Sequence, residues 1–150
     1  MPTDVIVAVT HPLAWIGSHP FAYPVLEVVH LIGIALLLGN LVAFELRVLG
    51  AAPDLPVQAL ARLSLGLAVA GFGLAALSGL LMFGTQPQEL LANRAFLIKM
   101  GLLAVAGGNA AGFHARGGLR RLDGLARAQT LWSLGLWIAI IICGRWIAYV

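Results

Sequence analysis

The sequence predicts an all-α fold: an integral membrane four-helix bundle, up-and-down in topology, with a short N-terminal interfacial segment. Two observations predict it. The 150 residues are 61% hydrophobic and only 10% charged, whereas roughly a quarter of the residues in a soluble domain are charged. Four apolar stretches are also long enough to cross a bilayer, which takes about 20 residues. We therefore expect a single transmembrane domain over residues 1–150.

Proline and glycine divide the apolar sequence into its expected elements. Proline ends a helix because it has no N–H and restricts the residue before it. The connectors AAPDLP, GTQPQE and ARGGLRRLDG carry these breakers. Between them, the predicted membrane spans cover about residues 24–49, 60–83, 92–113 and 130–150.

The segment before the first span, residues 5–23, is apolar but is interrupted by Pro12 and Pro20. It is too short to form a fifth span. We expect it to lie at the membrane surface, where aromatic side chains such as Trp15 and Phe21 are placed among the headgroups.

Arginine residues gather at the first and third connectors. Cytoplasmic loops of membrane proteins carry an excess of Lys and Arg, so we expect these two connectors to be cytoplasmic. Both termini would then be periplasmic in a bacterial inner membrane. The net charge of +3 does not indicate nucleic-acid binding, because most of the arginines flank apolar spans and form no basic stripe with exposed aromatics.

Four ionisable residues lie inside the apolar stretches at one predicted depth. Glu27 and His30 belong to the first span, Lys99 to the third and Arg145 to the fourth. With the orientation above, all four lie in the outer turns of their helices. Ionisable groups in hydrocarbon are expensive, so they mark a candidate functional site.

This outer layer has two interpretations. In the first, His30 is the axial ligand of a haem iron or contacts a quinone, and Lys99 or Arg145 neutralises the haem propionates. Glu27 would then orient the imidazole. In the second, Glu27 forms a buried ion pair with Lys99 or Arg145, and His30 donates a hydrogen bond to a carbonyl. A second axial ligand would come from His19 or His11, which precede the first span.

A second polar layer lies toward the cytoplasmic side and contains Asn40, Glu45, Asn109 and His114. We expect an interhelical hydrogen bond between the two asparagines, with the glutamate and the histidine near the headgroups. Lys99 marks the predicted depth of His30 in the third span, and it is ~22 Å from His114 along the axis of that span. His30 and His114 therefore cannot share one metal ion, and no CxxC, HxxxH or HExxH spacing indicates zinc.

Small residues predict where the helices approach most closely, because lipid gives helices no hydrophobic reason to associate. In the second span they recur at four-residue steps, at Gly71, Ala75 and Gly79. In the third span they are Gly101, Gly108 and Gly112. We expect both faces to form tight helix contacts.

The run PVLEVVHLIGIALLLGNLVAFELRVLG, followed later by FLIKMGLLAVAGGNAAGFH, resembles an uncharacterised family of small four-helix bacterial inner-membrane proteins. The matching positions in the first helix are Glu27, His30, Gly39 and the run Glu45-Leu46-Arg47.

Both runs are more distantly similar to the HemJ-type protoporphyrinogen oxidases and to CopD-type haem b membrane proteins. The HemJ resemblance implies bound haem b, with His30 and Lys99 at matching positions and His114 as a looser match. The chain departs from HemJ at the end of the first helix, where ELRVLG replaces an arginine and histidine run. This departure speaks against porphyrinogen oxidation and leaves haem binding open.

The expected function is that of a small, cytochrome b-like haem-binding protein in electron transfer or quinone-linked redox chemistry. Its partners would be the lipid bilayer and a membrane redox protein or quinone. One alternative is a cofactor-free, transporter-like bundle with the outer layer as its solute or proton site. The other is a structural accessory subunit of a larger membrane complex. The sequence leaves open whether the protein is an enzyme.

Overall fold

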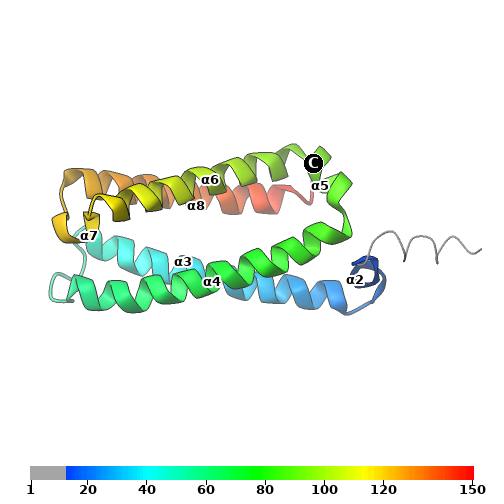
Figure 1. Cartoon of the computed structure of the whole chain (residues 1–150), viewed down its shortest axis with the longest axis horizontal. Coiled ribbons are helices and arrows are strands. Elements are labelled where there is room, and N and C mark those ends of the chain that lie inside the picture. The colour runs from blue at the N-terminus through cyan, green and yellow to red at the C-terminus, as the bar shows by residue number, and fades with distance from the viewer. Residues whose placement is uncertain (1–12) are drawn as a thin grey trace, which may run out of the picture.

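The computed structural model describes residues 13–150, and over that range the chain consists of helices and turns, with no β-strand. The helices in chain order are α2 (Ala14–Ser18), α3 (Ala22–Val48), α4 (Val57–Thr85), α5 (Pro87–Ala92), α6 (Arg94–Ala115), α7 (Gly118–Arg121) and α8 (Gly124–Trp146) (Figure 1). Four of them, α3, α4, α6 and α8, are long and apolar enough to cross a membrane. The predicted all-α membrane bundle of four helices is confirmed.

The bundle consists of two helical hairpins. Helix α3 packs along α4, α6 packs along α8, and the contact between α3 and α8 is much smaller than either. Figure 1 shows α2, α5 and the C-terminus at one end, which we call the terminal end. The α3–α4 turn and α7 lie at the other, which we call the connector end.

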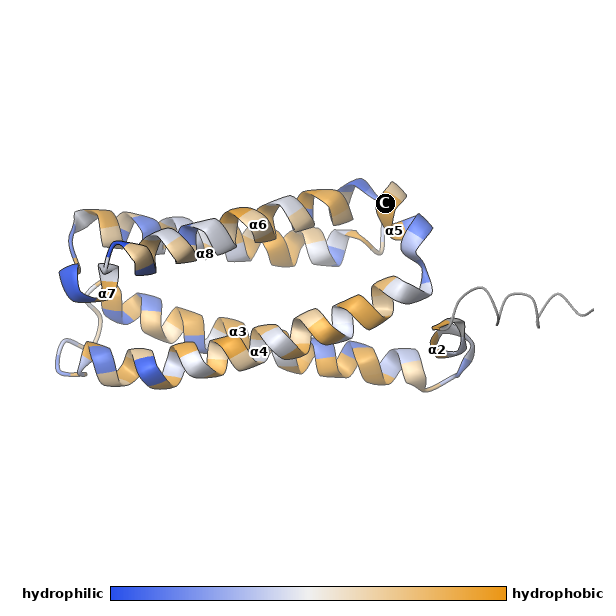
Figure 2. Cartoon of the chain, in the orientation of Figure 1, coloured by the Kyte–Doolittle hydropathy of each residue, from blue (hydrophilic) through white to orange (hydrophobic). Residues whose placement is uncertain are grey.

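Large apolar side chains cover the outside of the long helices. Leu31, Val69 and Ile138, for example, are each more than half exposed. Orange, apolar residues follow the long helices on all visible sides in Figure 2. A surface of this kind matches the hydrocarbon of a bilayer, where helices satisfy their own backbone hydrogen bonds.

Helix boundaries differ from the predicted spans where a local cap extends a helix into polar sequence. Helix α8 begins at Gly124, well before the predicted start at 130. Asp123 caps it, because its Oδ1 accepts a hydrogen bond of 2.8 Å from the N–H of Ala126. Helix α5 lies in a connector where no helix was expected, and it begins with Pro87 at a position where a missing N–H costs nothing.

The segment before the first span, as far as it is described, contains the short helix α2, and its residues 5–12 lie outside the described part of the chain. His19 has an extended backbone before Pro20 and separates α2 from α3. Ile16 is buried, and Leu13 packs against Gly84 near the end of α4. Trp15 and Phe21 are exposed, and their placement at the membrane surface stays a prediction.

Helices α3 and α4 touch backbone to backbone at two glycines. A Cβ atom on Gly71 would lie 2.5 Å from the backbone nitrogen of Leu37, and one on Gly33 would lie 2.6 Å from that of Ala75. The predicted close contact of the second span is therefore confirmed. In the third span the prediction holds only at Gly112, where a Cβ would lie 3.6 Å from Nε2 of Gln129 in α8. It is wrong at Gly101 and Gly108, where a Cβ would meet only open space.

The four long helices share a core at the connector end, where Phe44, Val48, Ala61, Phe113 and Ala126 are buried together. Phe44 and Phe113 meet edge to face, with ring centroids 6.2 Å apart. A second cluster, Ala106, Leu136 and Ile140, joins α6 to α8 alone. The buried cluster common to both hairpins thus lies at the connector end and not at the level of His30.

Candidate functional site

The imidazole of His30 lies on the α3 face that packs against α4. Its Nδ1 lies 2.8 Å from the carbonyl oxygen of Ala75 and 3.1 Å from the hydroxyl of Ser78. That hydroxyl has one hydrogen, which it donates over 2.6 Å to the carbonyl of Leu74. Because a carbonyl only accepts, Nδ1 is the donor in this arrangement.

This donor assignment fixes the tautomer of the neutral ring. With the hydrogen on Nδ1, the lone pair of His30 lies on Nε2, the nitrogen that coordinates a metal. Gly79 makes room for the ring, because a Cβ there would lie 3.3 Å from Cε1. The small-residue face of α4 thus serves both helix packing and the placement of one imidazole.

Lys99 comes to the same level from the second hairpin. Its side chain is half-buried and its Nζ lies against α8, 3.4 Å from where a Cβ on Gly144 would be. The ammonium is within electrostatic range of His30. The histidine and the lysine thus come from different hairpins and interact through their charges, with no hydrogen bond between them in the described part of the chain.

Arg145 and Glu27 lie farther toward the surface. Both side chains are exposed. The guanidinium of Arg145 donates a hydrogen bond of 2.6 Å to the hydroxyl of Tyr149 and lies 5.0 Å from the centre of its ring. Glu27 does not orient His30 here, because the ring partners come from α4.

The alternative interpretation of the outer layer required a buried ion pair with Glu27. Over residues 13–150 the one ion pair is between Arg116 and Asp123, at the connector end. Neither Lys99 nor Arg145 pairs with Glu27. The hydrogen bond from His30 to a carbonyl, which that interpretation also expected, is present.

The predicted second axial ligands are not brought to His30 within the described residues. His19 is exposed between α2 and α3, where its Nδ1 accepts a hydrogen bond from the N–H of Phe21. His30 lies eight residues into α3, ~12 Å further along the axis. His11 lies outside the described residues. Residues 13–150 also contain no group of three or more His, Cys, Asp or Glu side chains able to hold a metal ion.

The second polar layer differs from its prediction. Asn40 donates to the carbonyl of Leu36 in its own helix, and Asn109 donates to the backbone of Gln129 in α8. The expected bond between the two asparagines is therefore wrong, because each amide finds a nearer carbonyl. Glu45 was expected near the headgroups and is instead buried, with 3% of its surface exposed.

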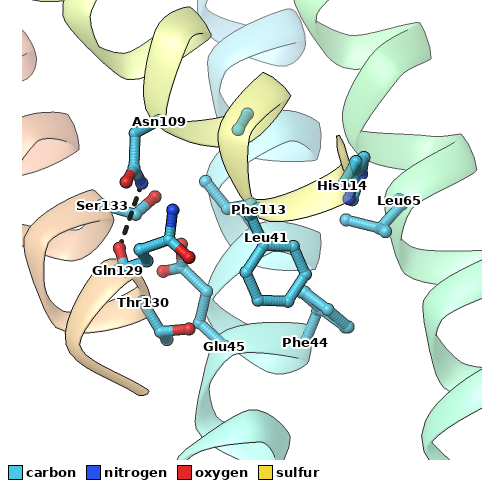
Figure 3. Close-up of a pocket in the computed structure, with 11 residues that line it drawn as sticks. Leu41, Phe44, Glu45, Leu65, Asn109, Phe113, His114, Gln129, Thr130 and Ser133 are labelled. Carbon is cyan, nitrogen blue, oxygen red and sulfur yellow. Dashed lines mark hydrogen bonds between the residues drawn. The ribbon is translucent and has the colours of Figure 1, made fainter. Parts of the chain in front are cut away.

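Glu45 borders a cavity of about 70 Å³ at the connector end, between α3, α6 and α8. Figure 3 shows its polar side formed by Asn109, Gln129, Thr130 and Ser133, and its apolar side by Phe44, Phe113 and Leu41. His114 lies at the edge of the cavity, beside Leu65, and is exposed. Sequence reasoning missed this cavity, although Thr130 and Ser133, three residues apart in an apolar helix, were a usable signal.

Comparison with protein-family models, with curated proteins and with solved structures found no match to this chain. Its function must therefore be inferred from its own residues.

Proposed function

We propose that this protein is a small b-type haem-binding membrane protein that acts in electron transfer or quinone-linked redox chemistry. His30 is its axial ligand, and Lys99 and Arg145 are the basic partners of haem propionates or of a quinone. The protein lies in a bacterial inner membrane with both termini periplasmic, in keeping with the arginines of the connectors.

The observation that carries the proposal is the hydrogen bond of 2.8 Å between Nδ1 of His30 and the carbonyl of Ala75. Histidines that bind metals donate their other ring N–H to a carbonyl, carboxylate or water, which fixes the tautomer and raises the basicity of the ligand nitrogen. All recorded hydrogen bonds of His30 use Nδ1. Its Nε2 is left to bind iron.

The charges around His30 also support a ligand with acidic groups. Lys99 is a half-buried cation without an acidic partner among the described residues. A cation held near the membrane interior without a counter-ion is expensive. A propionate or a reduced quinone oxygen supplies the missing negative charge, and haem b when bound supplies the one-electron couple.

The two hairpins meet at both ends of the bundle. The two hairpins share their buried cluster at the connector end, and their aromatic contact at the terminal end is the Phe83–Phe96 stack, 5.7 Å between centroids. His30 and Lys99 come from different hairpins, so a ligand between them would join the two.

The deciding experiment is an oxidised-minus-reduced visible spectrum of the protein purified in mild detergent from haem-supplied cells, with a pyridine haemochrome assay. We expect a b-type spectrum near one haem per chain, which His30→Ala removes. His114→Ala is the matched control, because His114 is exposed at the connector end, and it should keep the haem.

A folded wild-type protein without haem would overturn the proposal, as would a folded His30→Ala variant with full haem content. The outer layer would then belong to a transporter-like bundle or to an accessory subunit. Copurifying partner proteins would separate these two.

A further inference from the structure

We propose that the cavity at the connector end is a binding site for a monovalent metal cation of the Na⁺ class, with the carboxylate of Glu45 as its charged ligand. This site does not depend on the proposed haem, since His30 lies fifteen residues earlier in α3, ~22 Å away along the axis.

The carboxylate of Glu45 has one oxygen without a hydrogen-bond partner among the described residues. Glu45 is 3% exposed, and its Oε2 has no hydrogen-bond partner. Buried carboxylates are paired with a cation or fully hydrogen-bonded, because an unpaired charge away from water is very costly. Here the unpartnered oxygen borders a cavity rather than packed side chains.

Among residues 13–150, no basic side chain pairs with Glu45. Arg47, two residues along α3, donates to the carbonyls of Pro53 and Leu55 in the connector. Arg116, the residue after the end of α6, donates to Asp123 and to Oε1 of Gln129. His114 is the titratable group of α6 that lines the cavity, at its edge, and α4 contributes the apolar Leu65.

The remaining polar groups of the cavity are neutral oxygens. The hydroxyl of Thr130 donates to the carbonyl of Ala126, so its lone pairs remain available. The amide of Asn109 uses its nitrogen toward Gln129, which leaves Oδ1 as an acceptor. Ser133 adds a second hydroxyl from the same face of α8 (Figure 3).

This set of ligands fits a small, hard, singly charged ion. Hard cations prefer carboxylate, carbonyl, hydroxyl and water oxygens. One carboxylate with neutral oxygens balances one positive charge. A single imidazole at the edge of the cavity, that of His114, falls short of the set of nitrogen and sulfur ligands that zinc prefers. A cavity of about 70 Å³ holds the ion with a water molecule, since a water takes up ~30 Å³ of the liquid.

To test this site, the thermal unfolding midpoint of the detergent-purified protein is measured at increasing NaCl concentration. N-methyl-D-glucamine chloride is reduced in step, so that the ionic strength stays constant. A ligand that binds the folded state alone stabilises it in proportion to the logarithm of its concentration above Kd. We expect the midpoint to rise with Na⁺ in the wild type and in the control Glu89→Gln, an exposed glutamate of α5. Glu45→Gln should abolish the rise.

Ser133→Ala provides a second variant that keeps the charge and a folded helix. We expect it to weaken the apparent affinity for Na⁺ about tenfold, the usual effect of losing one polar contact to a charged group. A wild-type midpoint that does not respond to Na⁺, or a response that persists unchanged in both variants, overturns the site. A protonated-carboxyl infrared band that is present in saturating Na⁺ and lost in Glu45→Gln overturns it too, because a proton would then neutralise Glu45.

Discussion

Nδ1 of His30 in α3 donates to the carbonyl oxygen of Ala75 in α4, over 2.8 Å. Both residues lie where α3 and α4 approach most closely, and Ala75 is four residues after Gly71 in α4. The packing that holds the first hairpin together therefore also holds one imidazole in a single tautomer. A substitution at Gly71 should therefore disturb mainly the contact between α3 and α4, and one at Gly79 mainly the position of the His30 ring.

Replacing Gly79 should affect the histidine most directly. Gly79→Leu places side-chain atoms where the His30 ring lies, since even a Cβ would be 3.3 Å from Cε1. We expect haem content to fall, with a destabilisation of about 1–3 kcal/mol from overpacking. Gly73→Leu is the control, because a Cβ at Gly73 meets open space. Haem content measured by the pyridine haemochrome assay should separate the two variants, and equal loss in both would contradict the role of Gly79.

Gly71 and Gly66 give opposite predictions for the same substitution. Gly71→Ala should lower the free energy of unfolding by about 1–3 kcal/mol, because its Cβ would lie 2.5 Å from the backbone of Leu37. Gly66→Ala, on an open face of the same helix, should raise it by about 0.5–1 kcal/mol through helix propensity. Denaturation in mixed micelles measures both, and two changes of the same sign would argue against the backbone contact of α3 and α4.

Hydropathy predicts much of this fold because each membrane span needs a long apolar run, and such a run can be recognised in the sequence alone. Hydropathy does not show where a polar first turn begins. It therefore places the start of the last span at 130, whereas the Asp123 cap starts α8 at Gly124. Short helices such as α5 bury too little to leave an apolar pattern.

The sequence predicted the depth of the candidate site residues along their helices. It did not predict which way each side chain faces around its helix axis. Residue spacing placed His30 and Lys99 at one level, and the structure brings them within electrostatic range. The same spacing could not show that Glu27 is exposed and Glu45 is buried. A carbonyl partner for His30 was one of the two interpretations, but the sequence could not show that the carbonyl belongs to Ala75, because every residue has one.

The ion pair of the third connector predicts a dependence of stability on pH. Hydrogen bonds from Arg116, together with the backbone N–H of Ala126, lower the pKa of Asp123 below its ordinary value. A carboxyl whose pKa is lower in the folded state stabilises the protein fully above the unfolded-state pKa of about 4. That contribution is lost as the pH falls through the folded-state pKa.

Asp123→Asn should reduce this loss of stability at acidic pH. Asparagine is as good an N-cap as aspartate, so α8 keeps its start while the titrating group is removed. Thermal midpoints measured from neutral to acidic pH should fall less steeply in this variant than in Asp54→Asn, which removes one carboxylate from the first connector. Parallel curves for the two variants would mean that the Arg116 contact contributes nothing in solution.

Asn93 should stabilise the terminal end through two separable contacts. Its Oδ1 accepts from the N–H of Phe96 and caps α6, while its Nδ2 donates to the oxygens of Ile147 and Val150, 3.1 and 2.7 Å away. Asn93→Ser keeps a good cap and loses the donors, so we expect a cost of about 1 kcal/mol and faster amide exchange near the C-terminus. Asn93→Ala should cost about 1 kcal/mol more through loss of the cap. Amide exchange over residues 147–150 that is unchanged in Asn93→Ser would show that the hydrogen bonds to the C-terminal segment do not hold it.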